Sequence, residues 1–165
     1  MSPMCPGATP AQTVGPYFSL GLGGRPFSSL PATLCVRLKG YVLDGAGAPV
    51  PDALLEVWTP AGPRSGFFRM GVAADGSFEF PCWDASLDER AVQVHVMARG
   101  VLETLITVVW REDCAPQPDS PRWLGIPAAR RDTLRARKVG THYQWNIRLS
   151  GGAGAGETVF LDPAD

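Results

Sequence analysis

The residues best suited to chemistry lie in the middle of the chain, in the segment 91–99. Gln93 and His95 alternate there with three valines, and the segment ends at Arg99. Imidazole is a common metal ligand, so this polar face is where a metal enzyme would hold its ligands. A single histidine on a strand is more often a packed or hydrogen-bonded residue, and both interpretations of His95 stay open at this point.

Other catalytic patterns do not occur in the sequence. The chain has two histidines, no G-x-S-x-G nucleophile elbow and no glycine-rich phosphate-binding motif that follows a strand. The aspartates between residues 113 and 132 are scattered over a loop-like stretch, where carboxylates are usually solvated. The four cysteines form no C-x-x-C pair, so zinc-ribbon and redox motifs are not indicated.

Length and charge restrict the class of protein further. A chain of 165 residues fits one domain with an adequate core, and a net charge of -1 argues against a nucleic-acid or membrane-surface partner. The N-terminal residues have neither the basic region nor the apolar region of a signal peptide, and no apolar run is long enough to cross a bilayer. We therefore expect a cytoplasmic protein with reduced thiols.

The elements that would position these residues are short strands. The 19 glycines and 16 prolines separate apolar segments, which favours a turn-rich all-β fold. Asp75-Gly76 and Gly140-Thr141 are typical hairpin turns. About nine strands and little helix predict a β-sandwich, with strands expected at residues 34–44, 54–58, 67–70, 77–80, 91–97, 105–110, 134–139, 142–149 and 157–161.

Two segments outside the strands are expected to form contacts. Residues 1–32 are nearly uncharged but contain several large apolar side chains, which a disordered tail would seldom expose. We expect this N-terminal arm to lie on a surface, either of its own domain or of a partner, while residues 33–165 form the sandwich domain. The aperiodic stretch 111–132 is long enough to predict a functional loop or an interface.

Four segments in order resemble one known family. They are TPAQTVGPYFSLGL at 9–22, GYVLDGAGAPVPDALLEVW at 40–58, VMARG at 96–100 and GETVFLD at 156–162. Together they resemble the intradiol ring-cleaving dioxygenases, and most closely the α subunits of the protocatechuate-cleaving members. The resemblance implies a transthyretin-like β-sandwich of the intradiol dioxygenase type with an extended N-terminal arm, assembled with a homologous β subunit.

The resemblance also implies that this chain holds no metal and no catalytic residue. Catalytic chains of the family bind a non-haem ferric ion through two tyrosines and two histidines, and an H-x-H pair on the central strand supplies two of these ligands. The matching positions here are Ala91 and Gln93, and a shift of two residues would still supply only His95. No tyrosine occurs between residues 42 and 142, where both tyrosine ligands should fall. We therefore expect Fe(III) on the partner β subunit and not on this chain.

Substrate contacts are what the resemblance assigns to this chain. In the family the arm and an arginine of the α subunit line the pocket of the β subunit, and the matching residues are Thr13, Gly15, Pro16, Tyr17 and Arg99. Protocatechuate is an aromatic carboxylate, so a guanidinium and backbone donors suit its acidic end. With O2, the assembly would convert it to 3-carboxy-cis,cis-muconate.

Other functions stay open from the sequence. The chain could be a stand-alone transthyretin-like binding module, or a diverged paralogue with another catechol substrate or another metal site. Arg99 could be only an exposed charge at a strand end, and Gly15-Pro16 only a turn.

The expected loss of the iron ligands gives a first prediction. The purified chain alone should be colourless and should contain no stoichiometric iron, because the tyrosine and histidine ligands are missing. Metal analysis and visible absorption of the purified chain test this. A burgundy protein with a tyrosinate-to-iron absorption band would contradict it.

Overall fold

Alternating apolar and polar residues build a fold of short strands. The computed structural model describes residues 35–58, 67–84, 91–114, 125–151 and 156–162. These residues form nine strands and one 3-10 helix: β1 (Cys35–Leu43), β2 (Leu54–Trp58), β3 (Phe67–Gly71), β4 (Ser77–Asp84), β5 (Val92–Met97), β6 (Leu105–Arg111), η2 (Ala128–Leu134), β7 (Arg135–Val139), β8 (His142–Gln144) and β9 (Ile147–Arg148).

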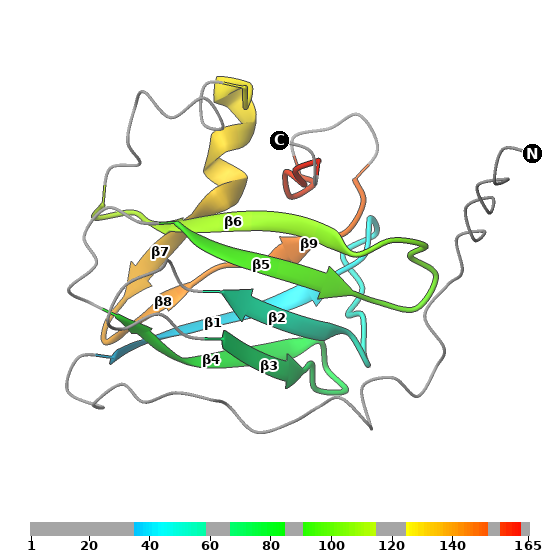
Figure 1. Ribbon diagram of the computed structural model, residues 1–165, viewed down its shortest axis with the longest axis horizontal. Helices are drawn as coiled ribbons and strands as arrows, with labels where there is room; N and C mark the ends of the chain where they lie inside the picture. The colour runs from blue at the N-terminus through cyan, green and yellow to red at the C-terminus, as the bar shows by residue number, and fades with distance from the viewer. Residues whose placement is uncertain (1–34, 59–66, 85–90, 115–124, 152–155, 163–165) are drawn as a thin grey trace, which may run out of the picture.

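The strands form two layers of a sandwich. One layer has the order β3-β2-β5-β6, the other has the order β7-β8-β1-β4, and β9 pairs with β1. The two layers are joined where β6 pairs in parallel with β7. Figure 1 shows β2 and β3 of the first layer lying over β1 and β4 of the second. The predicted all-β sandwich is confirmed.

The core lies between the layers and follows from the period of two along each strand. In β5, Val92, Val94 and Val96 are buried, whereas Gln93 and His95 lie on the opposite, partly exposed face. The prediction for this strand is therefore confirmed residue by residue. The opposite layers meet at Phe68 and Phe80, whose rings pack edge to face with centroids 4.7 Å apart.

The connection between β3 and β4 corrects the sequence prediction of a hairpin. Asp75-Gly76 does form a turn, in which Gly76 has φ +79° and donates its N–H to the carbonyl of Ala73 at 2.8 Å. However, β3 pairs with β2 and β4 pairs with β1, so this turn carries the chain from one layer to the other. Turn residues specify the change of direction, but they do not specify which strand becomes the partner.

The predicted strand at 142–149 is interrupted. It forms β8 and β9, and the two residues between them leave the strand conformation. Trp145 donates its backbone N–H to Lys39 at 2.9 Å, and the side-chain oxygen of Asn146 accepts the N–H of Tyr41 at 3.1 Å. The predicted hairpin at Gly140-Thr141 is confirmed by the antiparallel pairing of β7 with β8. Leu134, expected at the start of a strand, is the buried last residue of η2.

The closing strand predicted at 157–161 does not form. Leu161 makes a single antiparallel bridge to Ile106. Thr158 bonds twice with the backbone of Arg148, at 2.9 and 3.1 Å. The carbonyl of Val159 accepts the hydroxyl of Thr107 at 2.8 Å. Side-chain hydroxyls therefore satisfy backbone groups that a neighbouring strand would otherwise pair.

Several expectations concern residues outside the described ranges. The N-terminal arm, 1–32, is among them, so the division into an arm and a domain stays a prediction. The same holds for residues 115–124 of the predicted interface loop. No helix in the described parts of the chain is long and apolar enough to span a bilayer.

Gly40 lies too close to its neighbours to carry a side chain. A Cβ atom at Gly40 would overlap the carbonyl oxygen of Trp145 and would lie 2.9 Å from the ring of Phe78. Because a backbone carbonyl cannot move aside cheaply, Gly40→Ala should lower the free energy of unfolding by roughly 3 kcal/mol or more. Urea denaturation measures this change.

Gly71→Ala is the matched control for Gly40→Ala. Gly71 is also in a strand, and nothing lies within 4 Å of an added Cβ. This substitution should change the free energy of unfolding by less than about 0.5 kcal/mol. Equal effects of the two substitutions would contradict the close packing of β1 against Trp145.

Candidate functional site

A row of charged and polar residues crosses the outer face of the first layer. The strand register places Glu56 of β2 between His95 of β5 and Arg69 of β3. Arg69 Nε donates to Glu56 Oε1 at 2.8 Å, and the Arg69 Nη2 atom also contacts that oxygen. The Glu56 side chain is only 14% exposed. The guanidinium therefore supplies the positive charge that this mostly buried carboxylate needs.

His95 takes part in the same row through both ring nitrogens. The amide nitrogen of Gln93 donates to His95 Nε2 at 2.7 Å, which leaves the ring proton on Nδ1. This Nδ1 lies 3.9 Å from Glu56 Oε2. Burial lowers the pKa of His95 below 6.5, and the attraction of Glu56 only partly opposes that shift. His95 is therefore a neutral, hydrogen-bonded residue at pH 7.

Aromatic side chains border the polar row on one side. Trp58 of β2 packs against Phe67 of β3 with ring centroids 4.4 Å apart, and the guanidinium of Arg69 lies 5.3 Å from the centre of the Phe67 ring. The Trp58 ring is also 6.1 Å from the imidazole of His95. Trp58 remains 45% exposed, which is unusual for so large an apolar side chain.

The ferric ion of the catalytic relatives does not fit these residues. His95 offers one imidazole, but its Nε2 accepts a hydrogen bond from Gln93. Glu56 is neutralised by Arg69, so a cation at this carboxylate would have to displace a guanidinium. Among the residues that the structure describes, no group of three or more His, Cys, Asp or Glu is arranged to hold a metal ion.

Arg99 lies past the end of β5, and its side chain is 54% exposed. Its Nη2 atom donates to Asp52 Oδ2 at 3.3 Å. Thr13, Gly15, Pro16 and Tyr17, the other pocket residues expected from the sequence, lie outside the described residues. The structure therefore places Arg99 but does not test whether the arm meets it.

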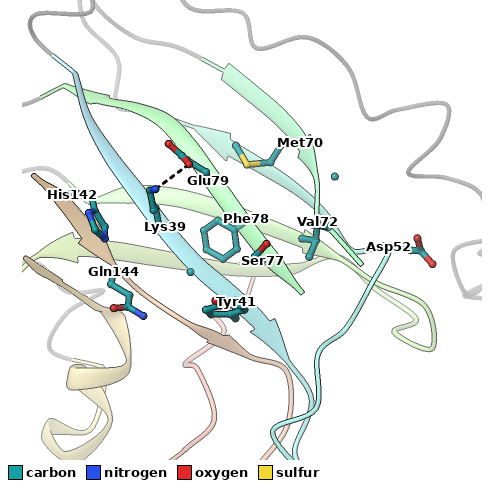
Figure 2. A pocket seen from close by; sticks show the side chains of 13 residues that line it. Lys39, Tyr41, Asp52, Met70, Val72, Ser77, Phe78, Glu79, His142 and Gln144 are labelled. Carbon is teal, nitrogen blue, oxygen red and sulfur yellow. Dashed lines mark ion pairs between the residues drawn. The ribbon is translucent and has the colours of Figure 1, made fainter. Parts of the chain in front are cut away.

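A groove of about 890 Å3 lies over the second layer and ends near Asp52. Its size is within the range of small-ligand sites. Figure 2 shows Lys39 and Glu79 paired in the groove, near His142 and Gln144, while the carboxylate of Asp52 points away from them. The Lys39 Nζ to Glu79 Oε2 distance is 3.3 Å, and both side chains are more than one third exposed. An exposed and internally paired lining offers few converging groups for a ligand.

Three residues with side-chain contacts at these sites were not identified from the sequence: Glu56, Arg69 and Asp52. Glu56 was visible within the family motif ending in EVW, but the motif gives no partner for it. The contacts of Arg69 and Asp52 follow only from the register of β2 against β3 and β5. A register cannot be read from one sequence, because each strand is compatible with several neighbours.

The polar row predicts the titration of His95. In two-dimensional NMR of the chain, the ring of His95 should titrate below pH 6.5, and Glu56→Gln should lower its pKa further by removing the opposing negative charge. Since the folded-state pKa lies below the unfolded value, the stability that depends on neutral His95 should be complete above pH 6.5 and decrease at lower pH. His142→Asn assigns the second histidine signal. A rise in the pKa of His95 after Glu56→Gln would contradict the arrangement.

Comparisons with known proteins agree with the fold. No protein-family model matches the chain. The protocatechuate 3,4-dioxygenase alpha chain of Burkholderia cepacia is 32% identical over 193 aligned positions, which cover 93% of this chain and 96% of that relative. This relative covers almost the whole of both chains, so it shows the family and confirms the predicted resemblance.

Solved structures share the fold at low identity. Hydroxyquinol 1,2-dioxygenase from Pseudomonas putida DLL-E4 matches with a TM-score of 0.51 and 17% identity, over 89% of this chain and 63% of that chain. Catechol 1,2-dioxygenase from Acinetobacter sp. ADP1 matches with a TM-score of 0.52 and 12% identity, over 85% and 58%. The sandwich fold and the sequence relationship lead to one conclusion: the chain belongs to the intradiol ring-cleaving dioxygenase family and is related to the protocatechuate 3,4-dioxygenase alpha chains.

Proposed function

We propose that this chain is a subunit without iron that completes the substrate pocket of a catalytic β subunit. The observation that supports this most strongly is the outer face of the first layer. A member of an iron-dependent family here has Gln93 and His95 hydrogen-bonded to each other and Arg69 bound to Glu56. This face offers a ferric ion a single imidazole, and its polar atoms already bind one another, so we assign the redox chemistry to the partner.

The proposed reaction follows from the family and from the relative named for protocatechuate 3,4-dioxygenase. The assembled enzyme breaks the bond between the two hydroxyl-bearing carbons of protocatechuate and adds one atom of O2 to each of them, which gives 3-carboxy-cis,cis-muconate. The β subunit holds non-haem Fe(III), and the present chain contributes binding groups. We place the assembly in the cytoplasm.

Arg99 is the described residue best suited to bind the substrate. It is half-exposed, its charge is permanent, and a guanidinium can donate two parallel hydrogen bonds to a carboxylate. The contact with Asp52 uses one of its terminal nitrogens, which leaves other donors for an anion. Thr13, Gly15, Pro16 and Tyr17 of the arm are proposed to line the same pocket. The aromatic carboxylate would thus be held at its acidic end, away from the reacting carbons.

Assembly is the first test of this proposal. Co-expression with its β partner should yield a stable hetero-oligomer, because the sequence of the arm is rich in large apolar residues and the described residues include exposed apolar side chains such as Trp58, which a partner can cover. Sedimentation of the co-purified chains measures the assembly. A soluble monomer that does not bind the β chain would support a stand-alone binding module instead.

Substitution of Arg99 is the second test. In the assembled enzyme, Arg99→Ala should raise KM for protocatechuate by about five- to thirty-fold with a smaller effect on kcat, which corresponds to loss of about 1 to 2 kcal/mol of uniform binding. The effect should be smaller for catechol, which lacks the carboxylate. Steady-state kinetics with both substrates measure the difference.

Arg137→Ala is the control for Arg99→Ala. Arg137 is another exposed arginine in an ion pair, with Asp132 at 2.6 Å, but it lies on β7 in the other layer. Its loss should leave the kinetics unchanged. If Arg99→Ala also leaves both substrates unaffected in an intact assembly, Arg99 is only a strand-end charge.

A further inference from the structure

We infer that Asp52 is a positioning residue, which holds the guanidinium of Arg99 in the orientation that meets the substrate carboxylate. This inference rests on the proposed function of Arg99. Asp52 occupies a position that the family motif G-x-P-V-P-x-A leaves free, so nothing in the motif selects it. Its role comes from where the fold places its side chain.

The strand register brings Asp52 and Arg99 together. The last paired residues of β2 and β5 at this end are Leu54 and Met97, and their pairing is antiparallel. Asp52 lies two residues before Leu54, and Arg99 lies two residues after Met97. The two residues are therefore opposite each other, two residues beyond the last paired positions of the strands. Their contact, Arg99 Nη2 to Asp52 Oδ2 at 3.3 Å, agrees with this continuation of the register.

Asp52 stands on a fixed part of the backbone. It has φ +62°, and it is the only non-glycine residue with positive φ in the described ranges. Pro51 restricts the chain before it. After it, Ala53 is fully buried and accepts the N–H of Val72 at 2.8 Å. The backbone at Asp52 is therefore restrained on both sides, which limits the positions that its carboxylate can take.

The backbone at Arg99 is less restrained than the backbone at Asp52. It follows the end of β5 in a tight turn, in which Val101 donates to the carbonyl of Ala98 at 3.2 Å and Gly100 has φ +83°. A long arginine side chain at an exposed turn samples many rotamers, and binding a ligand then requires ordering it. A hydrogen bond to Asp52 selects one direction for the guanidinium before the substrate arrives.

Orientation is the expected contribution of this ion pair, because its contribution to stability is small. Both side chains are about half exposed, at 54% for Arg99 and 48% for Asp52, and exposed ion pairs contribute little to folding. The contact uses one carboxylate oxygen and one guanidinium nitrogen, so it is not a closed bidentate pair. The carboxylate also points away from the Lys39–Glu79 pair of the neighbouring groove (Figure 2), and among the described residues its ion-pair partner is Arg99.

Two substitutions separate orientation from charge without straining the backbone. Glycine and asparagine both tolerate positive φ, so Asp52→Gly and Asp52→Asn preserve the turn. Asp52→Gly removes the hydrogen-bond acceptor, whereas Asp52→Asn keeps an oxygen acceptor and removes only the charge. If Asp52 acted instead by weakening the positive field of Arg99, both substitutions would lower KM for the anionic substrate.

The experiment uses the assembled complex with its β subunit. Asp52→Gly should raise KM for protocatechuate by about three- to ten-fold with kcat nearly unchanged, and should raise by a similar factor the Kd measured by equilibrium titration without O2. Asp52→Asn should stay within about two-fold of the unsubstituted enzyme, and KM for catechol should not respond to either change. Unchanged or lowered KM in Asp52→Gly would overturn the inference.

Arg99→Ala distinguishes failure of this inference from failure of the proposed function. A response to Arg99→Ala without a response to Asp52→Gly overturns only the role of Asp52. No response to Arg99→Ala overturns both. If Asp52 acts through Arg99, adding Asp52→Gly to Arg99→Ala should cause no further change. Asp132→Asn, in the exposed pair with Arg137, is the matched control and should leave both constants unchanged.

Discussion

The sandwich depends on a buried guanidinium at the seam where its two layers join. Arg111 ends β6 beside Ala136 of β7, is only 6% exposed, and lies with its Cζ 5.8 Å from the centre of the Tyr143 ring. Burial alone would lower its pKa, but the hydrogen bonds to Cys114 and the neighbouring charges raise it instead. Asp113 supplies the compensating carboxylate, with Arg111 Nε 3.6 Å from one oxygen and the Tyr143 hydroxyl donating to the other at 2.5 Å.

This seam ties stability to two protonation states. Partial burial raises the pKa of Asp113, but the bond from Tyr143 and the charge of Arg111 outweigh it and lower the pKa. Burial and the bond to Asp113 raise the pKa of Tyr143 to about 12. The contribution of ionised Asp113 is therefore lost as the pH falls below its usual range, and that of protonated Tyr143 is lost between pH 10 and about 12. The outer face of the first layer also pairs a mostly buried charge, since Arg69 of β3 there neutralises Glu56 of β2.

The sequence predicted what depends on local pattern and missed what depends on distant partners. Alternation was enough to place the valines of β5 inside and Gln93 and His95 outside. The turn at Asp75-Gly76 was also identified, but its two strands joined different layers, because pairing is decided by the whole sheet.

The segment 157–161 has strand-forming residues, yet hydroxyls of Thr107 and Thr158 take up backbone bonds that would have extended a sheet. The pair of Asp52 with Arg99 required the register of β2 with β5.

A subunit that binds substrate for a neighbour's metal should show that contact directly. The decisive measurement is the structure of the assembled complex with protocatechuate bound in the absence of O2. We predict one iron site, on the β subunit, with the guanidinium of Arg99 within hydrogen-bond distance of the substrate carboxylate and Asp52 still bonded to its other side. A complex in which β-subunit groups alone bind the carboxylate, while Arg99 points into solvent, would contradict the account.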